Sequence, residues 1–253
     1  GYSVYAEDHR GHGRTGEING KLGDMGEANA FERVCDDVVA LSTRARVENP
    51  GIPLVILGHS LGSLITQRIL LHHSDLYAAA VLSGSPDILN VAAAAELVHA
   101  EVDRVGRDQV SEVLESGIVE GFAAAFPDAT NPHAWLSREE AEIRQYEQDP
   151  WCGYALCAGA WQDLISSMVV TTELPAVAAG VRRTLPIYML SGSDDPVHND
   201  WQAIDRIAGN YRQCGLEDVT VKKYIGGRHE MFNESNRHEV TVDLLEWLAA
   251  KLA

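Results

Sequence analysis

The sequence predicts an α/β fold, in which a mostly parallel sheet is covered by helices on both faces. Short apolar runs of strand length alternate along the 253 residues with longer segments whose apolar residues recur at helical spacing. A Gly-x-Ser-x-Gly motif at 58–62 stands between one such run and a helix-like segment, as a turn from a strand into a helix requires. This alternation is typical of parallel sheets, because helices provide the crossovers between neighbouring strands.

The first part of the core is expected to span residues 1–86. Its first helix is indicated by apolar residues at helical spacing, and Pro50-Gly51 marks its end. The strands are short and apolar. In chain order we predict a strand at 1–8, a loop at 8–16, a helix from about 27 to 50, a strand at 54–57, a helix at 63–68 and a strand at 78–82.

Between residues 87 and 184 the alternation disappears, and Ala-rich and aromatic helical segments replace it. We predict an inserted helical cap with helices at 91–100, 139–148 and 161–168. A cap excludes water from a site at the strand ends and supplies apolar walls for a substrate. The candidate substrate-binding residues are Trp135, Trp151, Trp161, Leu164 and Met168, with Tyr146, Tyr154 and Leu156 beside them. The alternative for each of these residues is packing within the cap.

Residues 185–253 are expected to complete the core. A strand at 185–190 runs into an acidic turn, and a strand at 219–224 runs into a turn that carries His229. Apolar spacing predicts a helix from Trp201 to Tyr211, ended by Gly215, and a last helix around residues 240–248.

Ser60 is the predicted nucleophile. A serine on a sharp strand-to-helix turn presents its hydroxyl above the sheet, and the flanking Gly58 and Gly62 are expected to let the strand and helix backbones approach closely. We expect His59 to shape this turn. The backbone N–H of Leu61 can donate to the oxyanion of a reacting carbonyl group.

A serine hydroxyl needs a histidine base and a carboxylate that orients the base, and in this fold they follow in the order Ser, Asp, His. His229 is the predicted base. Asp195 is favoured over Asp194 as the acid, because a residue before proline is steered toward extended backbone, which suits a side chain aimed inward from a strand end. Asp87 is a further alternative.

Four motifs in order resemble the α/β-hydrolase superfamily, and within it the monoacylglycerol lipase and lysophospholipase-like serine hydrolases. They are residues 8–15, the turn at Ser60, the Gly-Ser-x-Asp turn at 192–195, and residues 226–230 followed by Asn233 and Glu234. The resemblance implies the α/β-hydrolase fold, with a helical cap inserted before the acid-bearing strand. It also implies that Asp195 is the acid, since Asp195 holds the fourth place of its turn.

The resemblance also implies that the first strands of the fold are missing, because residues 1–8 correspond to the fourth strand. We therefore expect either an N-terminally truncated chain or a re-paired sheet, and favour the first. The missing part would carry a loop that donates to the oxyanion beside Leu61.

The charge of the chain limits its partners. A net charge of −17 argues against nucleic acid, which requires clustered Lys and Arg, and against polybasic attachment to anionic lipid. Any contact with lipid surfaces is expected to be transient and apolar. The four cysteines show no metal-ligand pairing, His9 and His12 are expected to serve a structural turn, and no cofactor or metal is predicted. We expect a cytoplasmic protein, and the sequence does not predict its oligomeric state.

The expected reaction is hydrolysis of carboxylic esters of aliphatic acyl chains, such as monoacylglycerols or lysophospholipids, through an acyl-enzyme. One alternative is a catalytically impaired binding protein on the same scaffold. Another is a thioesterase, or an aminopeptidase-like hydrolase that uses acids in the cap, for which Glu139, Glu140 and Glu142 are candidates. Arg228 and Glu230 are expected to fix the loop of His229 through ion pairs.

Overall fold

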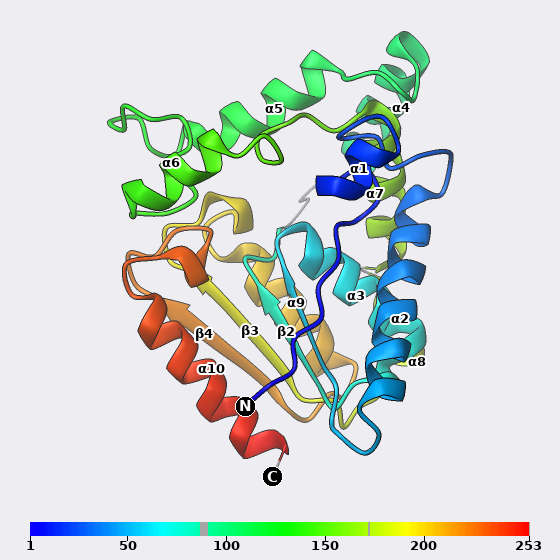
Figure 1. Cartoon of the computed structure of the whole chain (residues 1–253), viewed down its shortest axis with the longest axis vertical. Coiled ribbons are helices and arrows are strands. Elements are labelled where there is room, and N and C mark those ends of the chain that lie inside the picture. Colours follow the sequence, from blue (N-terminus) through cyan, green and yellow to red (C-terminus); the bar gives the residue numbers. More distant parts are fainter. Residues whose placement is uncertain (87–90, 172, 253) are drawn as a thin grey trace.

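The computed structural model describes residues 1–86, 91–171 and 173–252. At its centre lies a four-stranded parallel sheet in the order β1-β2-β3-β4 (Figure 1). The strands are β1 (Val55–His59), β2 (Ala79–Ser83), β3 (Ile187–Gly192) and β4 (Val219–Tyr224). The strands predicted at 54–57, 78–82, 185–190 and 219–224 are thus confirmed within two residues at either end.

The helices surround this sheet. They are α1 (Gly13–Ile18), α2 (Ala30–Glu48), α3 (Leu61–His73), α4 (Val91–Val105), α5 (Glu112–Ala123), α6 (Glu140–Gln148), α7 (Ala158–Thr171), α8 (Leu174–Gly180), α9 (Gln202–Gln213) and α10 (Arg237–Leu252), with short 3-10 turns at η1 (Ser74–Leu76), η2 (Pro196–His198) and η3 (Met231–Asn233). Spacing of apolar residues predicted α2, α9 and α10, and the helix-like composition of the sequence predicted α3, α4, α6 and α7. Neither predicted α1, α5 or α8.

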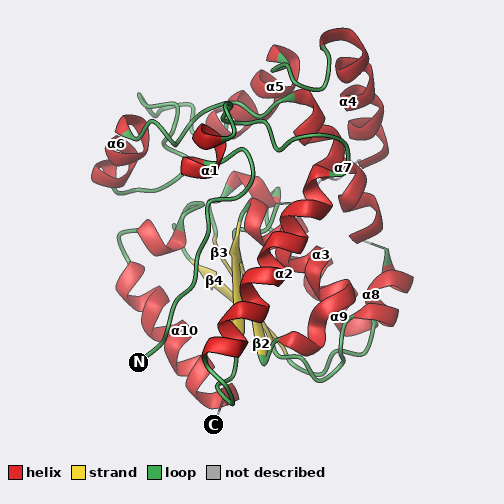
Figure 2. Cartoon of the chain, turned by 45° about the vertical axis from the view of Figure 1, so that its right-hand side comes forward, coloured by secondary structure: helices red, strands yellow, loops and turns green. Residues whose placement is uncertain are grey.

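The alternation of side chains along the strands divides the core into two apolar layers. Ile187 and Met189 of β3 point into a layer shared with α2, α3, α7 and α9. Tyr188 and Leu190 point to the opposite face, which α10 covers. Figure 2 shows α2, α3 and α9 on one side of the sheet and α10 on the other. All residues of β2 and β3 are buried, as expected for central strands covered on both faces.

The prediction of a strand at 1–8 is wrong. Residues 1–9 form no strand, and the side chain of Val4 is 86% exposed. The segment lies along α2, where the Tyr5 hydroxyl donates to Glu48 and the Arg10 guanidinium pairs with Asp37. Because its polar partners come from a helix, its backbone has no strand beside it with which to form a ladder.

The loop predicted at 8–16 is shorter in the structure, because helix α1 begins at Gly13. Local hydrogen bonds hold the turn before it. The backbone N–H of Arg14 donates to the Asp8 carboxylate, and a Cβ at Gly13 would lie 2.5 Å from that carboxyl carbon. The imidazole Nδ1 of His12 lies 2.8 Å from the carbonyl oxygen of Arg10.

The segment between β2 and β3 has two parts that differ in what they contact. Helices α5 and α6 lie beyond the carboxyl ends of the strands (Figure 1). By contrast, α7 packs against α2 and α3, and α8 packs against α3 and α9. The cap boundaries at 87 and 184 stay a prediction.

Gly180 allows the close approach of α8 to α3, since a Cβ there would lie 2.0 Å from the carbonyl oxygen of Leu71. We expect Gly180→Ala to lower the free energy of unfolding by about 2 kcal/mol or more, because a backbone atom cannot move aside as a side chain can. Gly209 is the matched control: it lies inside α9, and a Cβ there would meet nothing within 4 Å. Gly209→Ala should raise stability by about 0.5–1 kcal/mol. Urea denaturation measures both, and equal effects would contradict the packing argument.

Candidate active site

Ser60 sits on a strained turn between β1 and α3. Its backbone has φ 54° and ψ −117°, a conformation that non-glycine residues rarely adopt. Such strain costs about 1–3 kcal/mol and persists where surrounding structure imposes it, often at active sites. Here the Ser60 N–H donates to the carbonyl oxygen of Ser83 at 2.9 Å, which ties the turn to the end of β2.

The two glycines that flank Ser60 differ in what they provide. A Cβ at Gly58 would lie 2.1 Å from the carbonyl oxygen of Gly62, so only glycine fits at residue 58. A Cβ at Gly62 would meet nothing within 4 Å. The expectation that both glycines allow close approach is therefore right for Gly58 and wrong for Gly62, whose carbonyl is the group that is approached.

Leu61 is the first residue of α3. The first backbone N–H groups of a helix have no partner within the helix, and they lie at the positive end of its dipole. The Leu61 N–H is therefore suited to receive a negatively charged oxygen.

The two aspartates of the acidic turn after β3 differ in their exposure and in their hydrogen-bond partners. Asp195 is 2% exposed, and its carboxylate accepts hydrogen bonds from the Ser191 hydroxyl at 2.8 Å and the Val197 N–H at 2.9 Å. Asp194 is exposed and accepts from the Ser193 hydroxyl instead. The backbone of Asp195 is extended, in accordance with the proline that follows it.

His229 reaches the same carboxylate from the loop after β4. Its Nδ1 lies 3.0 Å from Oδ2 of Asp195, and its side chain is 3% exposed. Burial alone raises the pKa of Asp195, but the nearby His229 and the other donors outweigh burial and lower this pKa to about 2. Asp195 is therefore a buried carboxylate anion at neutral pH, bonded to an imidazole.

The imidazole of His229 also lies beside the turn that carries Ser60. Its ring centroid is 4.6 Å from that of His59, the residue before Ser60. A Cβ at Gly84, after β2, would lie 3.0 Å from ring atoms of both histidines. The structure thus brings the end of β1, the acid after β3 and the histidine after β4 to one edge of the sheet.

The predicted substrate-binding residues fall into two groups. Trp135 lies beside the predicted base, with its ring centroid 5.2 Å from that of His229. The ring of Trp151 instead packs against the guanidinium of Arg14. On α7, Leu164 and Met168 are buried in the larger apolar layer, and Trp161 packs against it. Substrate contact remains a prediction for all five. The indole N–H groups of Trp135, Trp151 and Trp161 are buried without a hydrogen-bond partner among the described residues.

Ser191 is a residue that sequence reasoning missed. It shares Oδ2 of Asp195 with His229, so it helps to hold the carboxylate. A serine at the end of an otherwise apolar strand, four residues before the acid, was the available signal.

The expected ion pairs of Arg228 and Glu230 are not found among the residues that the structure describes. The Arg228 guanidinium donates to the carbonyl oxygens of Ala134 and Ser137, and the Glu230 carboxylate accepts from Asn233. Arg228 and Glu230 thus hold the loop through hydrogen bonds to uncharged groups.

Two of the three candidate acids of the cap, Glu140 and Glu142, have basic partners of their own. Glu140 pairs with Arg144, and Glu142 pairs with Arg237. This placement gives no support to a site that captures a substrate amine. Asp87, the further candidate for the acid, lies outside the described residues.

Among the described residues, no group of three or more His, Cys, Asp or Glu side chains is placed to hold a metal ion. None of the helices in this part of the chain combines the length and the apolar character that crossing a membrane requires.

His59 should make the protein sensitive to acid. Burial, and secondly the nearby His229, lower the pKa of His59 from 6.5 to about 3, against an opposite effect of Asp195. The unfolded chain therefore takes up a proton near pH 6.5 that the folded protein does not, and stability falls as the pH drops from 6.5 toward 3.

We expect the wild-type protein to lose about 2 kcal/mol more stability than His59→Gln between pH 7.5 and 5, at about 1.4 kcal/mol per pH unit below 6.5. Urea denaturation at the two pH values measures the difference. His73→Gln, which removes an exposed imidazole, is the control. An equal loss in wild type and His59→Gln would contradict the prediction.

Comparison with known proteins identifies the family of the chain. The model of the Hydrolase_4 family, described as serine aminopeptidase, S33, matches residues 1–236. A monoacylglycerol lipase of Mycolicibacterium smegmatis is 30% identical, over 100% of this chain and 80% of its own length. Mouse monoglyceride lipase is 24% identical over 99% of this chain and 74% of its own.

Solved structures share the fold. A thermostable carboxyl esterase from Bacillus coagulans superposes with a TM-score of 0.88 at 21% identity, over 97% of this chain and 80% of that one. A monoglyceride lipase from Saccharomyces cerevisiae gives a TM-score of 0.71 at 19% identity, over 97% and 76%. The chain therefore belongs to the Hydrolase_4 family of the α/β-hydrolase superfamily, and it resembles the monoacylglycerol lipases.

Proposed function

We propose that this protein hydrolyses carboxylic esters of aliphatic acyl chains through an acyl-enzyme on Ser60. The protein is a carboxylic ester hydrolase at the level that its lipase and esterase relatives support. The observation that carries the finer proposal is the buried pair of His229 and Asp195 beside the strained turn at Ser60. A neutral imidazole held by a carboxylate is the base that a serine hydroxyl requires.

In the proposed first step, the Ser60 oxygen bonds to the ester carbonyl carbon while its proton passes to His229. Since Nδ1 of His229 faces Asp195, Nε2 is the nitrogen that takes this proton. Asp195 stays ionised and stabilises the imidazolium. The Leu61 N–H donates to the oxyanion, and loss of one such donor typically costs about 100- to 1,000-fold in turnover.

The bond to the leaving alcohol then breaks, and the alcohol oxygen takes the proton from His229. Water attacks the acyl-enzyme in the same way: its proton passes to His229, and from there back to the Ser60 oxygen as the carboxylic acid leaves. No other reactant is needed. The free base is restored at the end of each turnover.

The proposed substrates are small esters of the monoacylglycerol type. Support comes from the names of the relatives and from the aromatic side chain of Trp135 beside His229. Its flat apolar surface suits an acyl chain or a glycerol backbone, and its indole N–H has no partner among the described residues. Esters that differ in acyl length would define the preference.

Ser60→Ala should lower turnover by about a million-fold, because the atom that forms the acyl bond is gone. Hydrolysis of a series of p-nitrophenyl esters and of monoacylglycerols measures this effect, and a fluorophosphonate probe should label wild type but not the variant. Stability should stay within about 1 kcal/mol, since only one hydroxyl is removed. A folded wild-type protein that neither hydrolyses these esters nor reacts with the probe would refute the proposed function.

Asp195→Asn and Asp194→Asn form a matched pair. Asp195→Asn should lower kcat by about 10³- to 10⁴-fold, since an amide no longer favours the required imidazole tautomer. Asp194→Asn changes an exposed side chain bonded to Ser193, so we expect a change within about twofold. Steady-state kinetics on one ester distinguish them, and a larger loss in Asp194→Asn would reassign the acid.

A further inference from the structure

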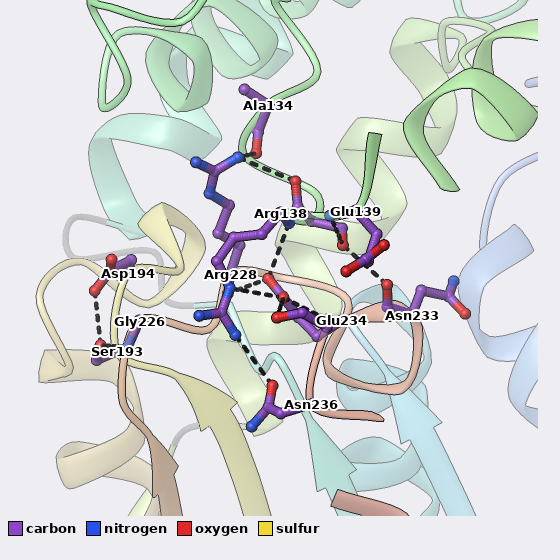
Figure 3. A network of polar contacts seen from close by, with 12 residues as sticks. Ala134, Arg138, Glu139, Ser193, Asp194, Gly226, Arg228, Asn233, Glu234 and Asn236 are labelled. Carbon is purple, nitrogen blue, oxygen red and sulfur yellow. Dashed lines mark hydrogen bonds and ion pairs between the residues drawn. The ribbon is translucent and has the colours of Figure 1, made fainter. Parts of the chain in front are cut away.

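A short segment of the region between β2 and β3 is hydrogen-bonded to the loop that carries His229. We call residues 134–139 the cap strap and residues 226–236 the histidine loop. Figure 3 shows how the side chains of the two segments cross: the Arg228 guanidinium of the loop lies beside Ala134 of the strap, and the Arg138 side chain of the strap reaches down to Asn236 of the loop. The two segments lie far apart in the chain, so side-chain and backbone hydrogen bonds, and not chain continuity, hold them together.

At the centre of this contact is the carboxylate of Glu234, whose side chain is fully buried. Oε1 accepts the backbone N–H groups of Arg138 at 3.1 Å and Arg228 at 2.9 Å. Oε2 accepts Nε of Arg138 at 2.8 Å, and the N–H and hydroxyl of Ser235 at 2.9 and 3.3 Å. Both oxygens thus join donors from the strap and the loop.

The charge of Glu234 is matched within the contact. Burial alone raises its pKa, but the hydrogen bonds from Arg138 and the backbone N–H groups outweigh burial and lower it. Arg138 is held in turn, because its Nη2 donates to Asn236. A buried carboxylate with this many donors is costly to leave unpaired, so the contact favours a single arrangement.

Further bonds extend the contact on both sides. The Ser137 hydroxyl donates to the carbonyl oxygen of Asn233 at 2.9 Å, and the Arg228 guanidinium donates back to the strap carbonyls of Ala134 and Ser137. At the start of the loop, the Gly226 N–H donates to the Ser193 hydroxyl in the acidic turn. The loop is therefore fixed against both the strap and the turn that bears Asp195.

The same strap reaches His229 itself. The His229 N–H donates to the carbonyl oxygen of Trp135 at 3.2 Å, and the Glu230 N–H donates to that of Leu136 at 2.8 Å. The Trp135 ring lies 5.2 Å from the imidazole. Whatever holds the strap in place therefore sets both the backbone of His229 and the aromatic wall beside its ring.

We propose that Glu234 is a positioning residue for His229. Its hydrogen bonds hold the cap strap against the histidine loop and thereby fix the position of His229. The assignment of His229 as the base rests on the proposed function, whereas the contact between the strap and the loop does not. A displacement of about 1 Å at a reacting group can cost about 100-fold in rate. A contact that sets the position of the His229 backbone can therefore control turnover.

Glu234→Gln tests this proposal. An amide has nearly the same shape as a carboxylate, but an NH₂ group replaces one of the two oxygens and cannot accept hydrogen bonds from the donors on that side. We expect hydrogen–deuterium exchange at the amides of His229 and Glu230 to become about tenfold faster. We expect the downfield proton resonance of the Nδ1–H bonded to Asp195 to shift or broaden. With an ester substrate, kcat should fall about 10- to 100-fold while KM changes less than about threefold.

Glu142→Gln is the matched control, since Glu142 also joins this region to the core, through an exposed ion pair with Arg237 at 3.4 Å. It should leave the exchange rates, the resonance and kcat unchanged. Arg138→Met is the second variant in case Glu234→Gln does not fold, because it removes one bond to Glu234 and leaves the others. It should change the same readouts in the same direction, by a smaller factor.

The outcomes are separable from those of the proposed function. Unchanged exchange and an unchanged resonance in a folded Glu234→Gln or Arg138→Met protein would overturn the proposal, and so would an equal effect of Glu142→Gln. Faster exchange with full ester turnover would overturn the positioning of His229. If wild type hydrolyses no ester, the proposed function fails, and exchange and the resonance alone decide whether Glu234 holds His229.

Discussion

The hydrogen bond between the buried carboxylate of Asp195 and the imidazole of His229 is the interaction on which the rest of the site depends. It joins the turn after β3 to the loop after β4, and these turns meet because the two strands pair in parallel. A carboxylate shut off from water is stable only when donors surround it, and Ser191, Val197 and His229 provide them. The pairing of β3 with β4 thus brings together the two turns whose groups stabilise the buried charge.

Close backbone contact provides the second constraint. A Cβ at Gly192 would lie 2.0 Å from the carbonyl oxygen of Gly227, so the end of β3 and the histidine loop touch where no side chain fits. Gly58 has the same role beside Ser60, where a Cβ would lie 2.1 Å from the carbonyl oxygen of Gly62. These contacts are stiff because they join main chain to main chain. They help to maintain the strained backbone of Ser60.

Much of this architecture could be predicted from the sequence, because apolar spacing and turn residues act locally. Four strands, seven helices and the pairing of Asp195 with His229 follow from patterns a few residues long. The strand expected at 1–8 failed for a different reason: strand propensity requires a neighbour, and here Tyr5 and Arg10 contact α2 instead. The roles of Ser191 and Glu234 were out of reach because each depends on donors that folding brings from elsewhere, such as Arg138 for Glu234. The different roles of Gly58 and Gly62 likewise appear only when the distance between main chains is known.

The order of strands has a consequence for how the chain folds. Neighbours β1 and β2 are close in sequence, as are β3 and β4, but β2 and β3 pair only after residues 84–186 have been looped out between them. Closing so long a loop is entropically costly and slows the formation of native contacts. The pairing of β2 with β3 is also what brings Ser60, which follows β1, to Asp195 and His229, which follow β3 and β4. The proposed reactive centre is therefore complete only once this long-range pairing has formed.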